Sequence, residues 1–578
     1  MASTPTPAPE QTLFVRKASG LVKGWSGGDG FRYSFFSVNL FLAIWSFAYA
    51  TFIPGGSMFW AIVITAIFIV LEIIVYAGLI SAMPRAGGDY VWQTRIFHSA
   101  VGFVIAAVGW WFILWLWTPI YADMGVQTTV KPIFRILGLN GAADWLGTAT
   151  GIFVASLVVI AIASTLVAIG MKSYAVFQKW AMWIGIAGVI VLGILLLVTS
   201  GNSFKEKFNE AANKYYGGDA GLLNLQKYQT DDAGLFLYDD AGALVPAEGE
   251  SYRGAFEAME AIGSGTGMPT STFSGGLSWA TWTLIPFMLF WMAWPNWGAT
   301  LYGEVRGAKD FRKNIYQMLG GLFVPTAIAL IFLALMTWKV GYQAFMGMAA
   351  AFWWGVSPIG GDYVSPTAMI SWIVPNAAVQ VILIAAVSLL LFGWFGTLFL
   401  SSTRMIFASA FDRILPEGAA RVTSSGVPVV ALLLMTIPSI IVAALYAYTP
   451  TTDLGVTVVK EFTYDATFGI VIMFTVSGLA FMVMKWRAAS IWDSSSLPKS
   501  GLAGIPWMSL CSAVYAAFMV FNIYLYVVKD VYGVNNRNSA IFMGVLYVAA
   551  IVIWVIAYFL RKSQGMELEA VAKEIPVE

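Results

Sequence analysis

The 578-residue sequence contains a single cysteine, Cys511, and a single histidine, His98. One cysteine excludes an intrachain disulfide, and one residue of each type is too few for a zinc site or for most nucleophile–base pairs. A glycine-rich phosphate-binding loop is also missing, so we expect neither enzymatic activity nor a bound cofactor or metal. His98 stands at the edge of an apolar run, where interfacial packing is favoured over a proton relay.

Charged residues are scarce as well. They make up 11% of the chain, against 59% hydrophobic residues, and the formal net charge is +1. Without a basic surplus to attract it, nucleic acid is not an expected partner. A composition this apolar is typical of an integral membrane protein, which has lipid as its surroundings. Residues 1–12 are polar and rich in Pro, Thr and Ala, which predicts a disordered tail and no signal peptide.

Long polar stretches are rare, and long apolar runs dominate instead. A helix needs about 20 residues to cross a hydrocarbon core of about 30 Å. Twelve runs have about this length, at 35–53, 59–82, 98–121, 149–169, 175–199, 279–301, 317–338, 370–402, 428–448, 466–484, 503–528 and 539–560. Backbone groups in lipid must be satisfied within the protein, and barrel strands would be shorter and alternating. The predicted fold is therefore an all-α integral membrane protein with about 12 transmembrane helices.

The Lys and Arg residues predict the orientation. If the N-terminus is cytoplasmic, 21 of the 32 lie in segments that face the cytoplasm, as the positive-inside rule requires. We therefore expect a multi-pass protein of the cell membrane with both termini cytoplasmic. Segment 200–278 holds many acidic residues and glycines. We interpret it as a partly ordered external insertion, most simply a solvated loop without a binding role.

Four segments carry more specific patterns. The first is MPRAGGDYVW, residues 83–92, between the second and third spans. Its proline ends a helix, its glycines allow a tight turn, and Arg85 can pair with Asp89. The others are GMKSYAVFQ (170–178), EVRGAKDFRKNI (304–315) and RMIFASAFDRILPEGAARVTSSGVP (404–428).

In chain order, these segments resemble four signatures of the amino acid–polyamine–organocation (APC) permease superfamily. The signatures are Pro-Arg-Ser/Ala-Gly-Gly-x-Tyr, a Gly-Val-Lys with a downstream Gln, an acidic-then-basic run after the sixth span, and Ser-Arg-x-x-x-Ala-Met-Ala-Arg-Asp-Gly-x-Leu-Pro followed by Gly-x-Pro. The resemblance covers residues 35–450 in outline. It implies a 5+5 inverted repeat of the LeuT-like kind, with helices 1 and 6 broken near the bilayer middle and two additional helices.

This implied fold divides the chain into six parts. They are a cytoplasmic N-terminal tail (1–34), a first repeat (35–199), the external insertion (200–278), a second repeat (279–484), two further helices (485–560) and a cytoplasmic C-terminal tail (561–578). Segment 343–356 fits a short external helix over the site, and an amphipathic interfacial helix equally well. We interpret GWSGGDG, residues 24–30, as a flexible lead into the first span.

The breaks in spans 1 and 6 predict the substrate site. Polar atoms in span 1 concentrate before Pro54, and Pro295 interrupts span 6. The family's small, backbone-exposing residues align here with bulky side chains. This favours a flat apolar solute or an amine stacked on aromatic rings, an altered register, or a site that no longer binds an amino acid. The predicted substrate-binding residues are Ser46, Phe47, Ala48, Tyr49, Trp294, Asn296 and Trp297.

Glu72 is the only acid that we place deep within a span, and burying a carboxylate in lipid is costly. Proton coupling, a structural hydrogen bond and sodium ligation remain open for it. The lysine that carries a proton in some relatives is replaced by Gly185. Thr397 and Ser401 in span 8 could add hydroxyl ligands for Na⁺, although such side chains more often bond their own helix.

The connectors after spans 2 and 6 predict a cytoplasmic gate. Its candidate residues are Arg85, Asp89, Glu304 and Arg306, as ion pairs that break in one state or as solvated pairs worth little energy. Together these features predict a secondary active transporter that moves amino acids or a related small organic solute by alternating access, coupled to protons before Na⁺. The alternatives are a carrier of amines or nucleobases, and a transporter-like structural or regulatory subunit that transports nothing. The oligomeric state stays open.

Overall fold

A computed structural model describes residues 24–573 except 218–222, 241, 424–425 and 453–455. Residues 1–12, for which a disordered tail is expected, lie outside this part. The α-helices are α1 (Gly27–Val38), α2 (Leu40–Ser46), α3 (Met58–Ala82), α4 (Asp89–Ile96), α5 (Ser99–Ala107), α6 (Leu114–Gly125), α7 (Lys131–Ile136), α8 (Asn140–Leu146), α9 (Ala149–Ala168), α10 (Met171–Val198), α11 (Gly201–Tyr216), α12 (Ala255–Gly265), α13 (Trp279–Thr283), α14 (Ile285–Met292), α15 (Phe311–Lys339), α16 (Tyr342–Trp353), α17 (Pro366–Ser371), α18 (Ala377–Phe411), α19 (Val429–Tyr448), α20 (Val458–Glu461), α21 (Thr463–Arg487), α22 (Ala489–Ser494), α23 (Trp507–Val528), α24 (Arg537–Ser563) and α25 (Leu568–Lys573).

Shorter helical turns and four strands complete the described structure. The 3₁₀ turns are η1 (Phe47–Phe52), η4 (Trp297–Leu301), η5 (Glu417–Ala420) and η6 (Asp530–Tyr532), and the π-helical turns are η2 (Val108–Phe112) and η3 (Val126–Val130). Strand β1 (Gln226–Tyr228) pairs antiparallel with β2 (Pro246–Ser251), and β3 (Gly501–Leu502) with β4 (Ile505–Pro506). The protein is thus an all-α membrane protein with marginal sheet.

Eleven continuous helical segments in the described residues are long and apolar enough to cross a membrane. They are Gly27–Phe52, Met58–Ala82, Ser99–Ile136, Ala149–Ala168, Met171–Val198, Phe311–Lys339, Ala377–Phe411, Val429–Tyr448, Thr463–Arg487, Trp507–Val528 and Arg537–Ser563. Each coincides with one of the predicted spans. The remaining prediction, 279–301, falls on the short pieces α13, α14 and η4.

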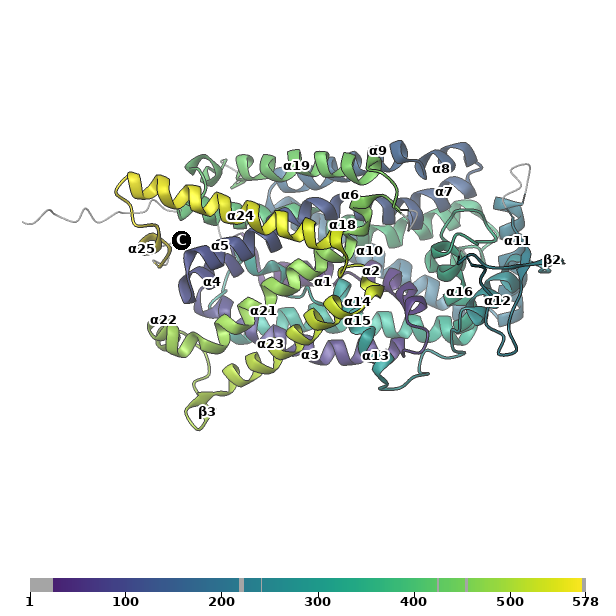
Figure 1. The fold of residues 1–578 in the computed structure, drawn as a ribbon, viewed down its shortest axis with the longest axis horizontal. Coiled ribbons are helices and arrows are strands. Elements are labelled where there is room, and N and C mark those ends of the chain that lie inside the picture. The colour runs from purple at the N-terminus through teal and green to yellow at the C-terminus, as the bar shows by residue number, and fades with distance from the viewer. Residues whose placement is uncertain (1–23, 218–222, 241, 424–425, 453–455, 574–578) are drawn as a thin grey trace, which may run out of the picture.

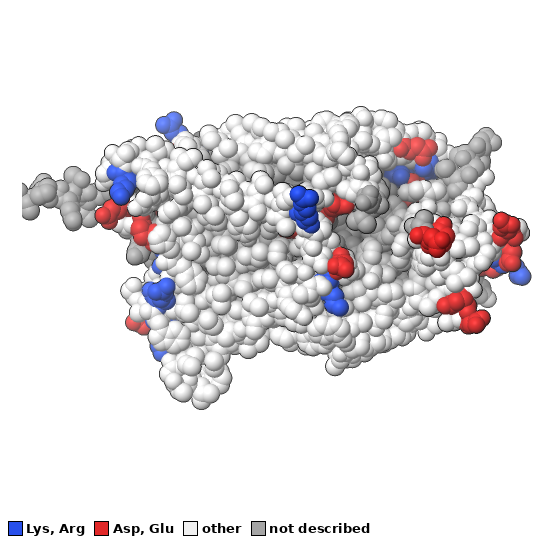
Figure 2. Space-filling model, in the orientation of Figure 1, with Lys and Arg blue, Asp and Glu red and all other residues white. Residues whose placement is uncertain are grey.

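The long helices run side by side along the longest axis of the molecule (Figure 1). One end carries α4, α22 and α25 and is called the α25 end here, while the other carries α11, α12 and α16 and is called the α11 end. On the visible face, acidic and basic residues gather toward the two ends and in a small group near the middle of the view, and the surface between the α25 end and that group is a largely uncharged band (Figure 2). Such a band suits the hydrocarbon core of a bilayer.

The first span starts earlier, and breaks earlier, than expected. Ser26 and Asp29 form a capping box that starts α1 at Gly27, so the prediction of a flexible lead is wrong. The interruption lies at Asn39, which has φ 54° and whose side chain accepts hydrogen bonds from the first turn of α2. Residues up to Phe52 continue in a 3₁₀ turn, so Pro54 ends the span and does not break its middle.

The interruption expected in segment 279–301 is confirmed. Helix α14 ends at Met292, and helical turns resume only at Trp297. Pro295 lies in this gap, and its carbonyl accepts a hydrogen bond of 2.9 Å from Ser34 of α1. The last turns of α1 are therefore joined to the gap in segment 279–301.

The expectation that the 200–278 insertion is partly ordered is confirmed as well. It contains α11, the β1–β2 pair and α12, and α12 packs on α16. The helix predicted near 343–356 is observed as α16. Gly263 of α12 and Gly347 of α16 bring the two backbones so close that a Cβ on either would collide with a carbonyl of the other helix.

We expect Gly347→Val to destabilise the protein, because the new side chain would strike the carbonyl of Met259 and the backbone cannot yield cheaply. Overpacking of this kind costs about 1–3 kcal/mol. The measurement is thermal unfolding of the purified protein in detergent. Gly361→Ala, at a position with open space around it, serves as the control and should leave the midpoint unchanged; equal midpoints for both variants would contradict the close packing.

Candidate functional site

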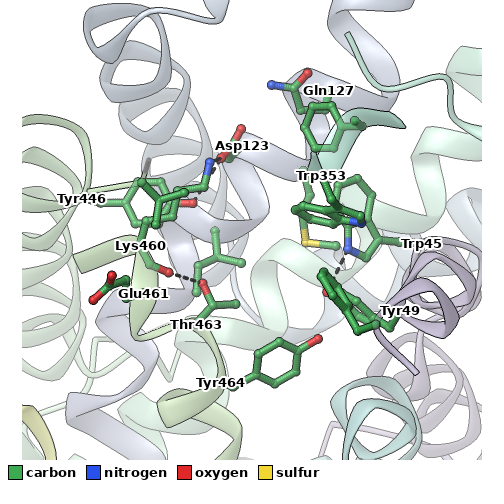
Figure 3. A pocket seen from close by; sticks show the side chains of 15 residues that line it. Trp45, Tyr49, Asp123, Gln127, Trp353, Tyr446, Lys460, Glu461, Thr463 and Tyr464 are labelled. Carbon is green, nitrogen blue, oxygen red and sulfur yellow. Dashed lines mark hydrogen bonds and ion pairs between the residues drawn. The ribbon is translucent and has the colours of Figure 1, made fainter. Parts of the chain in front are cut away.

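A cavity of about 220 Å³ lies among α2, η1, α6, α16, α19, α20 and α21. Figure 3 shows side chains converging on it from two sides, with Trp45 and Tyr49 on one and Lys460, Thr463 and Tyr464 on the other. Seven of the fifteen lining residues are aromatic. Because α16 belongs to the α11 end, the cavity lies in the half of the bundle toward that end. By size and lining it suits a small solute with a flat or apolar part.

One ion pair stands at the wall of this cavity. Lys460 Nζ lies 2.6 Å from Asp123 Oδ2, and the Tyr446 hydroxyl donates to the same oxygen at 3.2 Å. The Asp123 side chain is 10% exposed and that of Lys460 is 39% exposed. The acid is thus fixed and nearly buried, while its cationic partner reaches solvent. A positively charged solute group could replace Lys460 at Asp123 without leaving the carboxylate unpaired.

Several polar atoms of the cavity wall have no hydrogen-bond partner within the protein. They are Gln127 Oε1, Trp353 Nε1 and the hydroxyl of Tyr464. Buried polar groups are usually hydrogen-bonded, so an acceptor and two donors facing a cavity are groups that a bound solute or water can satisfy. The wall therefore offers both signs of charge and both kinds of hydrogen-bonding group.

Below the cavity, aromatic side chains fill the space around the gap in segment 279–301. Tyr49 contacts Phe290, with ring centroids 5.9 Å apart, and Phe290 contacts Trp117 at 6.4 Å. Trp117 stacks on Trp297 at 5.6 Å and meets Trp294 at 5.3 Å. Together with Trp110 and Trp394, which also pack on Trp297, these three indoles form what we call the tryptophan layer. All five indoles are fully buried and none lines the cavity, to which Tyr49 and Phe290 connect the layer.

The predicted substrate-binding residues fall into two groups separated by this packing. Tyr49 lines the cavity, with its hydroxyl accepting a hydrogen bond from Trp45 at 2.9 Å. Its neighbours in the prediction are buried but do not line the cavity; Phe47, for example, packs on Phe345 of α16. These neighbours are Ser46, Phe47 and Ala48. None of the four lies at the break, because that break is at Asn39.

The second group lies at the break itself. Trp294 and Trp297 belong to the tryptophan layer, and Asn296 between them is fully buried. Neither amide atom of Asn296 has a hydrogen-bond partner, and Asn39 Nδ2 is also unpaired. The two interruptions thus share the unusual feature of buried asparagines with unsatisfied groups.

The hydroxyls expected as sodium ligands are already engaged. Thr397 donates to Trp394 of its own helix at 2.6 Å, and its carbonyl accepts from the Trp297 indole at 3.2 Å. Ser401 lies 2.9 Å from the Tyr33 hydroxyl and donates to the Trp297 carbonyl at 3.2 Å. The structure therefore brings these predicted residues to the break in segment 279–301, where they hold its backbone. Among the described residues, no group of three or more His, Cys, Asp and Glu side chains could hold a metal.

Glu72 is fully buried on α3, and neither of its carboxyl oxygens makes a hydrogen bond of ordinary geometry. Asp89, at the start of α4, is also fully buried but accepts three hydrogen bonds. The donors are Tyr76 at 2.5 Å, Ser477 at 2.5 Å and Trp110 at 2.8 Å. Burial raises the pKa of the Asp89 carboxyl, and the three hydrogen bonds oppose that rise in part.

At the α25 end, two buried ion pairs connect α18 to other elements. Arg404 binds Glu304 through two nitrogens at 2.6 and 3.2 Å, and Arg95 binds Asp412 at 2.7 and 3.1 Å. The Tyr90 hydroxyl also donates to Asp412 at 2.8 Å. Bidentate geometry of this kind fixes both partners in direction as well as distance.

The observed pairing differs from the one predicted for the cytoplasmic gate, whose role as a gate stays a prediction. Of its four residues, Glu304 forms an ion pair, but with Arg404 from outside the predicted set. Asp89 is held by neutral donors, and Arg85 donates to the carbonyl of Pro84 at 3.2 Å. The backbone N–H of Arg306 donates to Trp25 at 3.0 Å, which ties the start of the described chain to this region. Arg404 lies in the 404–428 segment, and the sequence carries no sign of which acid it binds.

Sequence reasoning also missed the ion pair of the cavity. The predicted third span ends at residue 121, whereas the helical segment continues to Ile136 and includes Asp123. A second buried acid, Asp465, lies within Thr463–Arg487, just before the predicted start of that span. Glu72 is therefore not the only acid inside a span. The sequence feature that could indicate this ion pair is Lys460, a single basic residue next to an apolar run.

We expect Glu304→Gln to lower stability strongly, because it leaves the buried guanidinium of Arg404 without its counter-charge. Breaking a buried pair by removing one partner costs about 3–5 kcal/mol. The control is Glu417→Gln, which breaks an exposed pair with Arg413 and should cost less than about 1 kcal/mol. Thermal unfolding in detergent measures the stability loss of both variants. Similar losses would contradict the exclusion of water from the Glu304–Arg404 pair.

A comparison with protein-family models finds no match, and neither does a comparison with curated proteins. The geometry of the site itself is therefore the basis for interpreting its function.

Proposed function

We propose that the protein is a secondary active transporter that moves a small organic solute across the membrane by alternating access. One observation carries the proposal: a cavity toward the α11 end is separated by the tryptophan layer from an opposite end held together by buried ion pairs. This arrangement suits a carrier that is accessible from one side at a time. The α11 end is the external one in the proposed topology, with both termini in the cytoplasm.

Two interrupted helical segments support this mechanism. The gap after Val38 and the gap after Met292 lie in segments 1 and 6 of the chain, and the hydrogen bond from Ser34 to Pro295 joins them. Broken helices in corresponding positions of two halves are typical of carriers built from a 5+5 inverted repeat. We include such a repeat in the proposal, as the resemblance to APC permeases implies.

The substrate proposed for this site is an amino acid or a related small organic solute. A cavity of about 220 Å³ exceeds the engineered cavity of about 150 Å³ that binds benzene, yet falls short of typical drug-binding pockets. The aromatic walls suit an apolar or cationic group. Asp123 and Lys460 suit a solute that carries charge of either sign.

We propose coupling to protons rather than to Na⁺. Glu72 supports this choice, because a carboxylate without a counter-charge or hydrogen bond is most stable in its protonated form inside a membrane protein. Thr397 and Ser401 are poor sodium ligands, because their hydroxyls are already hydrogen-bonded to carbonyl groups and to Tyr33.

A second candidate function is a transporter-like subunit that binds a partner and carries nothing. The observation that favours it is the tryptophan layer, which fills the region of the breaks with five buried indoles. An amine or nucleobase carrier is the remaining alternative, because flat and cationic groups both stack on aromatic faces. Each makes a different prediction for solute binding.

We expect a solute of one chemical class to raise the unfolding temperature of the purified protein, since a ligand that binds only the folded state stabilises it by RT ln(1 + [L]/Kd). The panel contains amino acids, amines and nucleobases. In Asp123→Asn, the solute concentration needed for the same shift in unfolding temperature should rise at least about tenfold. Glu250→Gln, a matched change on the 200–278 insertion away from the cavity, should not alter it. A shift untouched by Asp123→Asn would move the binding site elsewhere.

Alternating access can be tested with thiol labelling, because Cys511 is the only native cysteine. In a Cys511→Ser background, Thr463→Cys in the cavity should react with a membrane-impermeant thiol reagent. Thr300→Cys, fully buried beside Gly88 at the α25 end, should stay unreactive until a transported solute is added. Thr300→Cys that never reacts, under any solute that stabilises the protein, would favour the subunit that transports nothing.

A further inference from the structure

We propose that a second cavity, on another face of α6 from the solute cavity, binds one hydrocarbon chain of a membrane lipid, and that this lipid supports the wall of the solute cavity. The effect on solute binding rests on the proposed function above, whereas lipid binding itself does not. The ligand comes from the bilayer around the protein, and the site lies outside the residues predicted for solute, ions or gate.

The second cavity has a volume of about 220 Å³ and lies among α6, η3, α8, α9 and α18. None of the fifteen described residues that line it is charged, and two of them, Tyr121 and Thr129, have a polar side-chain atom. The Thr129 hydroxyl is already hydrogen-bonded to Ser388, at 2.7 Å. A buried water needs two to four polar partners, so this wall suits a dry, apolar occupant.

Two lining residues of α9 connect this cavity with the lipid-facing surface. Val154 is 38% exposed and Val158 is 53% exposed, and both belong to the membrane-spanning segment Ala149–Ala168. The inner wall is deeply buried, with Ala122 of α6 2% exposed and Leu391 of α18 1% exposed. A helix within the hydrocarbon core is surrounded by acyl chains. The cavity is therefore continuous with the surface that contacts lipid, and a hydrocarbon chain is the occupant at hand.

Helix α6 separates the two cavities. Ile120, Asp123, Met124 and Gln127 line the solute cavity, whereas Tyr121, Ala122, Gly125 and Val126 line the second one. Positions three and four residues apart share one face of a helix, so the two sets occupy different faces of α6. A hydrocarbon chain in the second cavity therefore packs against the helix that presents Asp123 to the solute.

The hydrogen bonding of α6 is irregular, which makes its position depend on what packs against it. Pro119 lies inside the helix, and the π-helical turns η2 and η3 precede and follow it. Such features interrupt the regular ladder of backbone hydrogen bonds. The ring of Tyr121 also packs on Trp117 at 5.7 Å and on Trp394 at 5.9 Å. The second cavity thus borders the tryptophan layer as well.

The test is photolabelling of the full protein in phosphatidylcholine vesicles that contain a trace of phosphatidylcholine with a diazirine in its acyl chain. Mass spectrometry then locates the labelled residues. We expect label on buried lining residues such as Ala122 and Leu391, which lipid on the protein surface cannot reach. Label confined to exposed positions, such as Val158 and Val548 of α24, would show surface lipid only and overturn the site.

Two variants show whether the label enters through this cavity. Ala155→Trp places an indole in the cavity and should remove most of the label on Ala122 and Leu391. Val548→Trp, at a lipid-facing valine that is 59% exposed and does not line the cavity, is the matched control and should leave that label unchanged. If Ala155→Trp does not fold, Val158→Trp at the mouth provides the block. Label on the buried residues that persists in the blocked protein would overturn the site.

Support of α6 is tested by thermal unfolding in detergent with a stabilising solute. Adding phosphatidylcholine should lower the solute concentration needed for a given shift in the wild type, because a wall fixed in advance costs less to order. In Ala155→Trp the lipid should have no such effect. No effect in the wild type, or an equal effect in both proteins, would overturn the support of α6. If the buried residues are labelled but no solute stabilises the protein, the lipid site stands and the transport proposal fails.

Discussion

Inside a bilayer, a backbone N–H or C=O that leaves a helix finds no water, so every interruption of a spanning segment needs partners within the protein. Both interruptions meet this requirement through side chains. Asn39 receives the first N–H groups of α2 on its own side-chain oxygen, and Ser34 donates to the carbonyl of Pro295. Since Ser34 lies one turn before the break at Asn39, one short stretch of the first segment both restarts its own helix and supports the gap in the other.

The aromatic residues fill the space that the two breaks leave. A helix that stops and restarts cannot present a continuous stripe of medium-sized side chains, and the large indoles of Trp117, Trp294 and Trp297 occupy the resulting volume. Rings of this size pack edge to face and in offset stacks. Because their side chains have few rotatable bonds, this packing costs little rotamer freedom. They also separate the cavity, with its ion pair of Asp123 and Lys460, from the buried polar groups at the breaks. In the proposed transport cycle, a solute would therefore have to displace tryptophan side chains.

The membrane-spanning helices could be predicted from sequence because hydropathy over about 20 residues reports burial in lipid directly. Pro295 also predicted its interruption, because proline removes a backbone donor wherever it stands. Asn39 gave no such signal, since its positive φ and its capping role depend on tertiary contacts that hold the first segment. The partners of buried charges were equally hidden: Glu304 and Arg404 are a hundred residues apart, and residue spacing carries no information about which of several arginines folds back onto a given acid.

Buried acids in this bundle have two kinds of partner, either arginines or neutral groups. Glu304 and Asp412 are held by arginines in bidentate geometry, which makes them parts of the framework. Glu72 and Asp89 have neutral neighbours, so their charge depends on whether a proton is bound. An arginine beside Glu72 would have made that region rigid and insensitive to pH. Among the described side chains no ion pair forms there, and the indole N–H of Trp110 donates to Asp89 next to the break instead.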